Sequence, residues 1–161
     1  MFVFSFSPKK IHKKFIYFFI AAVLTVIVTV IIIFLSCREK NTTINYENSS
    51  YETKVQSIES MIKFASQFGW KTDSQPDEVT DIIIPSRFNE VYEHYNDIQK
   101  RVGLDLSSFK GKECKKYSFK IINYPSKNDV NLNLIVLNDR VVGGDISENI
   151  MNGFMKSFAD T

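Results

Sequence analysis

The sequence predicts an α+β fold in which an N-terminal transmembrane helix precedes one small domain. Three features indicate this: an uncharged run from Phe15 to Leu35, two amphipathic helical patterns, and several alternating strand patterns. As a helix, the run would rise about 32 Å at 1.5 Å per residue, which matches the ~30 Å hydrocarbon core of a bilayer. We therefore expect two amphipathic helices, packed on a mainly antiparallel sheet of about four strands, to follow the span.

Charge around the apolar run predicts its orientation. Four lysines precede the run and only two basic residues closely follow it, namely Lys9, Lys10, Lys13 and Lys14 before it and Arg38 and Lys40 after it. Because positive charge favours the cytoplasmic side, we expect a single-pass protein of the cell membrane with an outward-facing C-terminal domain. The segments are a cytoplasmic stub at 1–14, the span at 15–35, a solvated linker at 36–50 and an extracytoplasmic α+β domain at 51–161.

A lipoprotein is the alternative to an uncleaved anchor. The run ends in Phe34-Leu35-Ser36-Cys37, which resembles a bacterial lipobox in which a small residue precedes a lipidated cysteine. The run is longer than the apolar region of an ordinary signal peptide, which favours the anchor. Both interpretations place the same domain outside the membrane.

Composition limits the partners of this domain. Residues 41–161 hold 14 Lys and Arg against 17 Asp and Glu, a net charge of −3, so nucleic acid is not the implied partner. About 110 residues are enough for one core and too few for two.

Cys37 and Cys114 are badly placed to form a disulfide, and Cys114 is expected to be a small, semi-buried apolar residue.

Two helices are expected in the domain. The first begins at a Ser49/Glu52 capping box, ends at Gly69, and has an apolar stripe of Val55, Ile58, Ile62, Ala65 and Phe68. The second ends at Gly103 and has a stripe of Phe88, Val91, Tyr95, Ile98 and Val102.

Strand patterns occur at 78–84, 113–122, 130–137 and 140–146. The last two flank Asn138-Asp139, a pair typical of tight hairpin turns. The tail from Ser147 is predicted to be a short helix or loop that covers the sheet.

Chemically suggestive clusters also have structural explanations. Glu90, Glu93, His94 and Asp97 share one helical face, which could in principle hold a divalent metal. A solvated face opposite the apolar stripe is the stronger interpretation. Gly143-Gly144-Asp145 lacks the residues of a phosphate loop, and the glycines favour a bulge or a close backbone approach. The sequence therefore assigns no catalytic, cofactor-binding or metal-binding residue.

One basic cluster comprises Lys110, Lys112, Lys115, Lys116 and Lys120. It suits contact with anionic lipid head groups or a wall polymer. Protection of an edge strand explains it equally well.

The ectodomain resembles a known family over nearly its whole length. The matching strings are Gly69-Trp70, Ile83-Ile84-Pro85, Tyr95-Asn96-Asp97-Ile98-Gln99, Gly103-Leu104-Asp105-Leu106, Gly111-Lys112, Asn123-Tyr124-Pro125, Gly143-Gly144-Asp145 and Gly153-Phe154-Met155. They resemble the bacterial domain-of-unknown-function family 4830. The resemblance implies a small, singly anchored protein of Gram-positive bacteria and implies no activity.

Three functional hypotheses follow. The first is a non-catalytic binding or interaction module tethered outside a bacterial membrane, with other envelope proteins as partners. The second is a cell-envelope hydrolase that uses carboxylates such as Asp145 and Glu148, because hydrolysis of wall sugars needs only two acids. The third is a structural subunit whose anchor assembles with other helices. Ala21, Thr25 and Thr29 recur every fourth residue, a spacing that favours weak homodimers.

Overall fold

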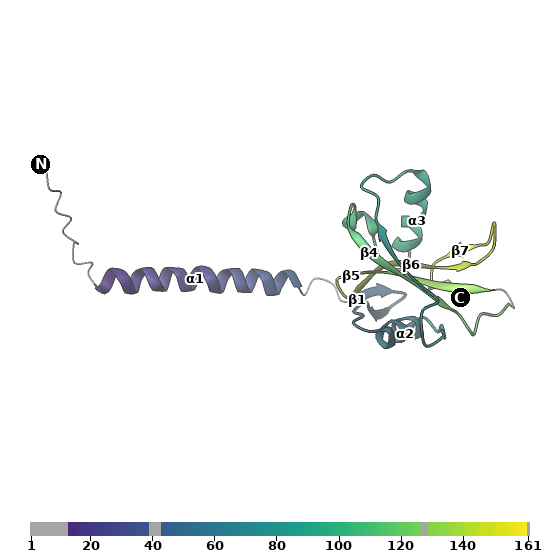
Figure 1. The fold of residues 1–161 in the computed structure, drawn as a ribbon, viewed down its shortest axis with the longest axis horizontal. Helices are drawn as coiled ribbons and strands as arrows, with labels where there is room; N and C mark the ends of the chain where they lie inside the picture. Colours follow the sequence, from purple (N-terminus) through teal and green to yellow (C-terminus); the bar gives the residue numbers. More distant parts are fainter. Residues whose placement is uncertain (1–12, 39–42, 127–128, 161) are drawn as a thin grey trace, which may run out of the picture. The chain divides into compact units, whose positions relative to one another are not determined.

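The computed structural model describes residues 13–38, 43–126 and 129–160, except for the side chains of 13–16 and 34–38. The chain divides into two compact units, residues 1–40 and 41–161. The described part of the first unit is one helix, α1 (Lys13–Arg38) (Figure 1). The second unit holds every other element and is treated by itself below.

The α1 helix corrects the prediction of a transmembrane helix at 15–35. Within residues 13–38, 43–126 and 129–160, no helix is both apolar enough and long enough to cross a membrane. The hydroxyl groups of Thr25 and Thr29 donate to the carbonyls of Ala22 and Val26, each at 2.8 Å, and so are satisfied within the helix.

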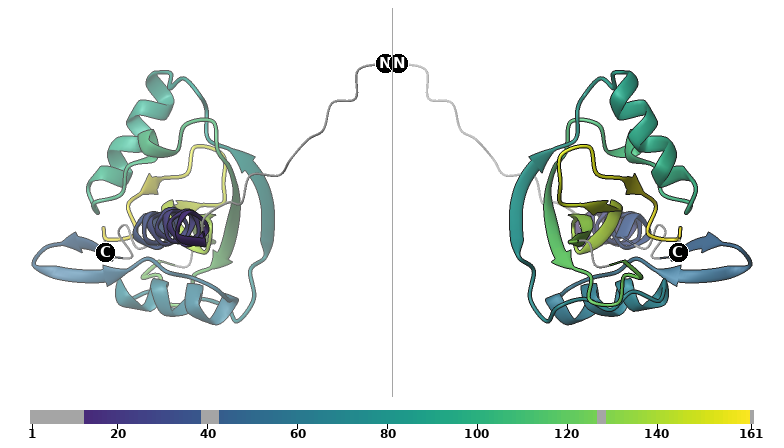
Figure 2. Two further views of the ribbon diagram at one scale, coloured as in Figure 1. Left: turned by 90° about the vertical axis from the view of Figure 1, so that its left-hand side faces the viewer. Right: turned by 90° about the vertical axis from the view of Figure 1, so that its right-hand side faces the viewer.

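The second unit is built on a five-stranded antiparallel sheet in the order β3-β4-β5-β6-β7. Its strands are β3 (Glu78–Ile83), β4 (Glu113–Lys120), β5 (Val130–Leu137), β6 (Arg140–Glu148) and β7 (Met155–Lys156). Figure 2 shows β3 as the outermost strand on one side, with α2 (Ile58–Gln67) and α3 (Glu90–Lys100) on opposite faces of the sheet. A sheet of five strands replaces the predicted sheet of about four.

Each face of the sheet has its own apolar cluster. On the α2 face, Phe64, Phe119, Leu132, Leu134 and Phe158 are almost fully buried within the larger cluster. On the α3 face, a smaller cluster of buried residues consists of Ile84, Leu106, Cys114, Ile135 and Val142. Alternation along β4 and β5 directs successive side chains to opposite faces, so both strands contribute to both clusters. Cys114 is buried as predicted, and burial raises the pKa of its thiol.

Helix α2 begins later than the sequence predicted. Ser57 caps it, and a reciprocal capping box joins Ser57 to Ser60. The predicted Ser49/Glu52 box instead lies in a strand, since β1 (Thr43–Tyr46) and β2 (Ser49–Glu52) form a separate hairpin. Sheet structure therefore begins inside the segment predicted as a solvated linker. Gly69 ends the helix with a positive φ of 84°, as predicted.

Helix α3 has a wider buried face than predicted, and only Val91 of the predicted stripe lies outside it. Val91, expected in the core, is 76% exposed, whereas Asn96 and Gln99 are almost fully buried. The carboxamide of Asn96 accepts from the Leu106 amide at 2.8 Å and donates to Asp105 at 2.9 Å. Periodicity of apolar residues missed this face because buried polar side chains are stable where they are hydrogen-bonded.

The β5–β6 hairpin agrees with its prediction. Asn138 and Asp139 both have positive φ, as a type I′ turn requires. The register shifts by one residue beside Ile135 and Val136. At Gly144 an added Cβ would lie 2.3 Å from the Asn133 carbonyl oxygen, which confirms that glycine permits a close backbone approach.

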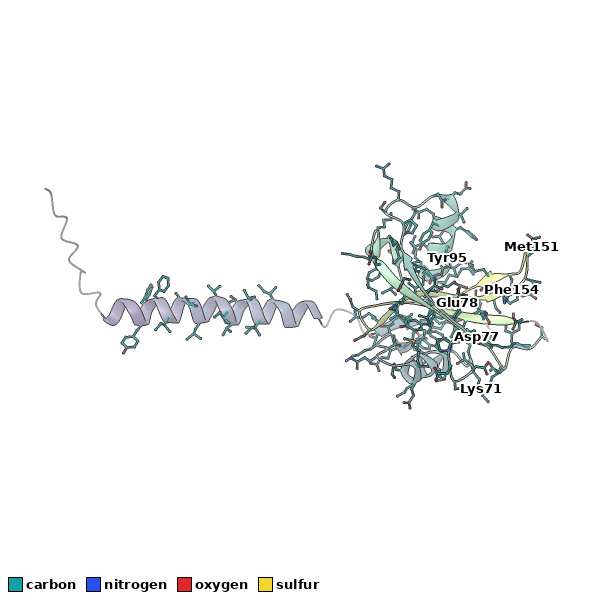
Figure 3. All side chains as sticks on the ribbon, viewed as in Figure 1. Lys71, Asp77, Glu78, Tyr95, Met151 and Phe154 are labelled. Atoms are coloured by element: carbon teal, nitrogen blue, oxygen red, sulfur yellow. The ribbon has the colours of Figure 1, made fainter. Side chains whose placement is uncertain are left out.

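The tail differs from the predicted helix or loop. It forms the short strand β7, and Phe158 beyond it is completely buried. The carbonyl of Phe158 accepts a 2.6 Å hydrogen bond from the Trp70 indole, so the tail closes the α2 face. Met151 projects from the loop between β6 and β7 (Figure 3).

Candidate functional site

A groove of about 440 Å³ lies on the α3 face of the sheet. All five strands and α3 contribute to its lining, which combines apolar side chains with a polar floor. Its charged and polar lining includes Glu78, Tyr95, Lys116, Asn131, Asn133, Asp145 and Glu148. We call it the α3-face groove; Figure 3 labels Glu78 and Tyr95, which come from β3 and α3.

Asp145 is the centre of the polar floor. It is only 4% exposed, and its two carboxylate oxygens accept hydrogen bonds from the Tyr95 hydroxyl at 2.9 Å and from the Asn133 carboxamide at 2.8 Å. Asn133 also donates to the Ser147 hydroxyl at 2.9 Å and accepts from the Ser118 hydroxyl at 2.7 Å. The network therefore joins α3 to β4, β5 and β6.

Burial shifts the acidity of both groups in the Tyr95–Asp145 pair. Removal from water raises the pKa of Asp145, and hydrogen bonds from Asn133, Tyr95 and Ser147 partly oppose that effect. Burial also raises the pKa of Tyr95 well above its ordinary value, and the nearby carboxylate adds to the shift. The tyrosine hydroxyl thus stays protonated and remains a donor to Asp145.

A second set of hydrogen bonds fixes α3 beside the glycine pair. The side-chain oxygen of Gln99 accepts from the Gly144 amide at 2.8 Å, and its nitrogen donates to the Tyr95 carbonyl at 3.3 Å. An added Cβ at Gly143 would lie 2.8 Å from the Leu106 side chain. Gly143 therefore permits close packing against Leu106, and Gly144 permits close packing against β5.

Asn131 is the exception on the polar floor. Its side-chain oxygen is buried and has no hydrogen-bond partner among the described residues. Asn131 lies opposite Ser147 in the ladder and beside the groove. A buried acceptor without a donor is destabilising. At Asn131 the polar floor therefore has unused hydrogen-bonding capacity.

The second groove, of about 750 Å³, lies at the end of the sheet beside β3. Its lining includes Asp81, Glu113, Lys115, Tyr117 and Asp139. In the β3–β4 register, Asp81 lies opposite Lys115 and on the sheet face that α3 does not occupy. We call it the α2-face groove. One strand, β3, thus contributes to both grooves.

The acidic cluster with His94, predicted on one face of the second helix, lies on the surface of α3. Glu90, Glu93, His94 and Asp97 are all exposed on α3, which confirms a solvated face. In the part of the chain that the structure describes, no group of three or more metal-ligating side chains could hold an ion.

Of the two proposed acids, Asp145 is buried, while Glu148 is half-buried and lines the same groove. The predicted lipobox side chain of Cys37 lies outside the described residues.

Strand alternation divides the predicted lysine cluster. Lys116 lines the α3-face groove and Lys115 the α2-face groove. Lys115 pairs with Asp81 at 2.8 Å and Lys120 with Asp129 at 2.9 Å. Lys110 lies 4.2 Å from the centre of the Phe88 ring. These lysines do not form one continuous basic patch.

The family of this chain is identified by a family model that covers most of the groove-forming elements. The sequence model named Domain of unknown function (DUF4830) matches residues 64–146, slightly more than half of the chain. The chain belongs to this family. No curated protein and no solved structure matches. The matched segment runs from α2 into β6 and includes Tyr95, Asn133 and Asp145, whereas β1, β2 and β7 lie outside it.

Sequence reasoning missed most of the floor. Asp145 was predicted only as one of two candidate hydrolase acids beside a glycine pair, and neither Tyr95 nor Asn133 was assigned a polar role. One signal was available: Asn131 and Asn133 alternate with leucines in an otherwise apolar strand. A repeated amide on one face of a central strand indicates a polar lining on that face.

Proposed function

We propose that this DUF4830 protein is a non-catalytic interaction module held on the outer side of a bacterial cell membrane by its first forty residues. The observation that carries the binding role is the α3-face groove, whose polar floor and apolar rim are features of a ligand site. Asp145 supports a non-catalytic role, since both of its oxygens already accept hydrogen bonds from side chains that fix the fold.

The proposed location depends on residues 1–40. Lysines concentrate before the apolar run, and the described side chains of α1 are exposed and apolar apart from its two threonines. A helix that is apolar on all sides is stable only in apolar surroundings. We infer that residues 1–40 keep the chain at the membrane, that weak self-association occurs through Ala21, Thr25 and Thr29, and that envelope proteins are the partners of the domain.

Fractionation and protease digestion test the location. We expect the chain to sediment with membranes after a carbonate wash, and external protease to remove residues 41–161 from intact protoplasts. Protection of the domain would contradict the outward placement. The mass of the mature N-terminus distinguishes a chain that starts at Met1 from one that starts at a lipidated Cys37.

Site-specific photocrosslinking tests the binding role. A crosslinking residue at Glu78, in the α3-face groove, should give defined adducts in native membranes. The same residue at Ser66, exposed on α2, is the matched control and should give none. Equal labelling from both positions would contradict a binding site in the groove.

A carboxylate-dependent hydrolase is the second candidate because one observation favours it. Asp145 is buried with a raised pKa, as a general acid requires, and it shares the groove with Glu148. Release of soluble fragments from purified cell wall by the full chain, abolished by both Asp145→Asn and Glu148→Gln, would establish this activity and refute the non-catalytic role.

A further inference from the structure

Strand β3 has an open edge. It pairs with β4 on one side only, and it is the outermost strand in both views of Figure 2. Just beyond β3, the Ile84 amide donates to the carbonyl of Lys112, the residue before β4, at 3.0 Å. Since main-chain groups alternate in direction along an antiparallel ladder, those of Val79, Asp81 and Ile83 are directed away from β4.

The outward residues of β3 are also accessible. Val79 is 49% and Ile83 65% exposed, and the Asp81 side chain is 82% exposed. Pro76 and Pro85 lie just beyond the two ends of the strand. The edge thus offers a six-residue segment with unpaired outward groups, which is long enough for another strand to pair with it.

The two grooves lie on either side of this edge. Glu78 and Ile82 face the α3-face groove, whereas Asp81 lies by the α2-face groove. Side chains of an added strand would point alternately toward one face and the other. Each groove would then receive every second side chain of the added strand.

The charged side chains that line the two grooves indicate which side chains of an added strand they would bind. Three acidic side chains and one lysine line each groove: Glu78, Asp145, Glu148 and Lys116 in one, and Asp81, Glu113, Asp139 and Lys115 in the other. No lysine or arginine occurs between Lys71 and Arg87. Asp81 pairs with Lys115 and Asp145 is buried. The acidic side chains that meet a cationic partner are therefore Glu78 and Glu148 on one side of the edge and Glu113 and Asp139 on the other.

We propose that the β3 edge binds an extended, lysine- or arginine-rich segment of a partner protein as an added sixth strand. This deepens the proposed function by naming the partner's chemistry. Main-chain hydrogen bonds to Val79, Asp81 and Ile83 supply affinity, and the two acidic grooves select the side chains. The same acidic residues oppose pairing of β3 with a second copy of itself, because like charges across a ladder repel.

A synthetic strand tests the chemistry. The probe is the fluorescent peptide Lys-Thr-Val-Lys-Lys-Val-Thr-Lys, which has lysines on both faces, and the control has Glu at the four Lys positions. Binding to the full chain in detergent is followed by fluorescence anisotropy. We expect the lysine peptide to bind at least tenfold more tightly than the glutamate peptide, an advantage that falls with added salt. Equal binding of both peptides would overturn the proposal.

A paired substitution tests the strand geometry. Val79→Pro removes one outward amide while the bonds to β4 remain, a change that edge strands tolerate, and Val79→Thr is the matched control. We expect Val79→Pro to weaken the lysine peptide roughly tenfold and Val79→Thr to leave it unchanged, with both variants folded by circular dichroism. Unchanged binding to Val79→Pro would overturn strand addition. If Val79→Pro binds the peptide as the wild type does while a crosslinker at Glu78 still gives adducts in native membranes, only strand addition is rejected. If the crosslinker at Glu78 also gives no adducts, the binding function is rejected as well.

Discussion

Removal of the Asn133 side chain is the most informative perturbation of the polar floor. Asn133→Ala deletes three hydrogen bonds, to Asp145, Ser147 and Ser118, at 2.7–2.9 Å. A buried group left without its partner costs about 1–3 kcal/mol, and more when it is charged. Because Asp145 loses a buried hydrogen-bond donor, we expect the free energy of unfolding to fall by roughly 3 kcal/mol.

Asn131→Ala is the matched control on the same strand and face. The Asn131 oxygen has no partner in the described structure, so its removal should change stability by less than about 0.5 kcal/mol. Urea unfolding of residues 41–161, followed through the single Trp70, gives both values; this segment contains every described residue of both core clusters. Equal losses in the two variants would refute the assignment of Asn133 as the hub of the network.

Three further perturbations test the packing and the electrostatics. Gly144→Ala should prevent stable folding or cost more than about 3 kcal/mol, because its Cβ would lie 2.3 Å from the Asn133 carbonyl oxygen; a wild-type urea midpoint would contradict this. Ile98→Ala should cost roughly 2 to 5 kcal/mol and Val91→Ala almost nothing, given that they are 7% and 76% exposed; equal losses in the same titration would contradict the exposure of Val91. The raised pKa of Asp145 contributes stability that is fully present below the ordinary Asp pKa and is lost as pH rises through the raised value. Asp145→Asn should remove this fall from a series of urea titrations between acid and neutral pH, and an unchanged slope would contradict the shift.

Local sequence signals predicted the strands well. Val130–Leu137 agrees at both ends, β3 ends at the residue before Ile84-Pro85, and the Asn138-Asp139 turn has the expected positive φ. These features depend on alternation and on turn residues, which act over a few neighbours. They are therefore available without knowledge of the tertiary structure.

Features that depend on tertiary contacts were not predictable in the same way. The prediction that Ser49 and Glu52 form the capping box of α2 was wrong because those residues pair with β1. Ser57 caps the helix instead. The polar part of the buried face of α3 was missed because Gln99 is buried and accepts a hydrogen bond from a glycine amide 45 positions along the chain. Such long-range partners override apolar periodicity.

Amide chemical shifts of the ¹⁵N-labelled domain, titrated with the lysine peptide, test the recognition surface most directly. If the edge of β3 is that surface, the largest changes will occur at Val79, Asp81 and Ile83, and hydrogen exchange at these amides will slow. Changes centred on α2, or none at saturating peptide, would contradict the account.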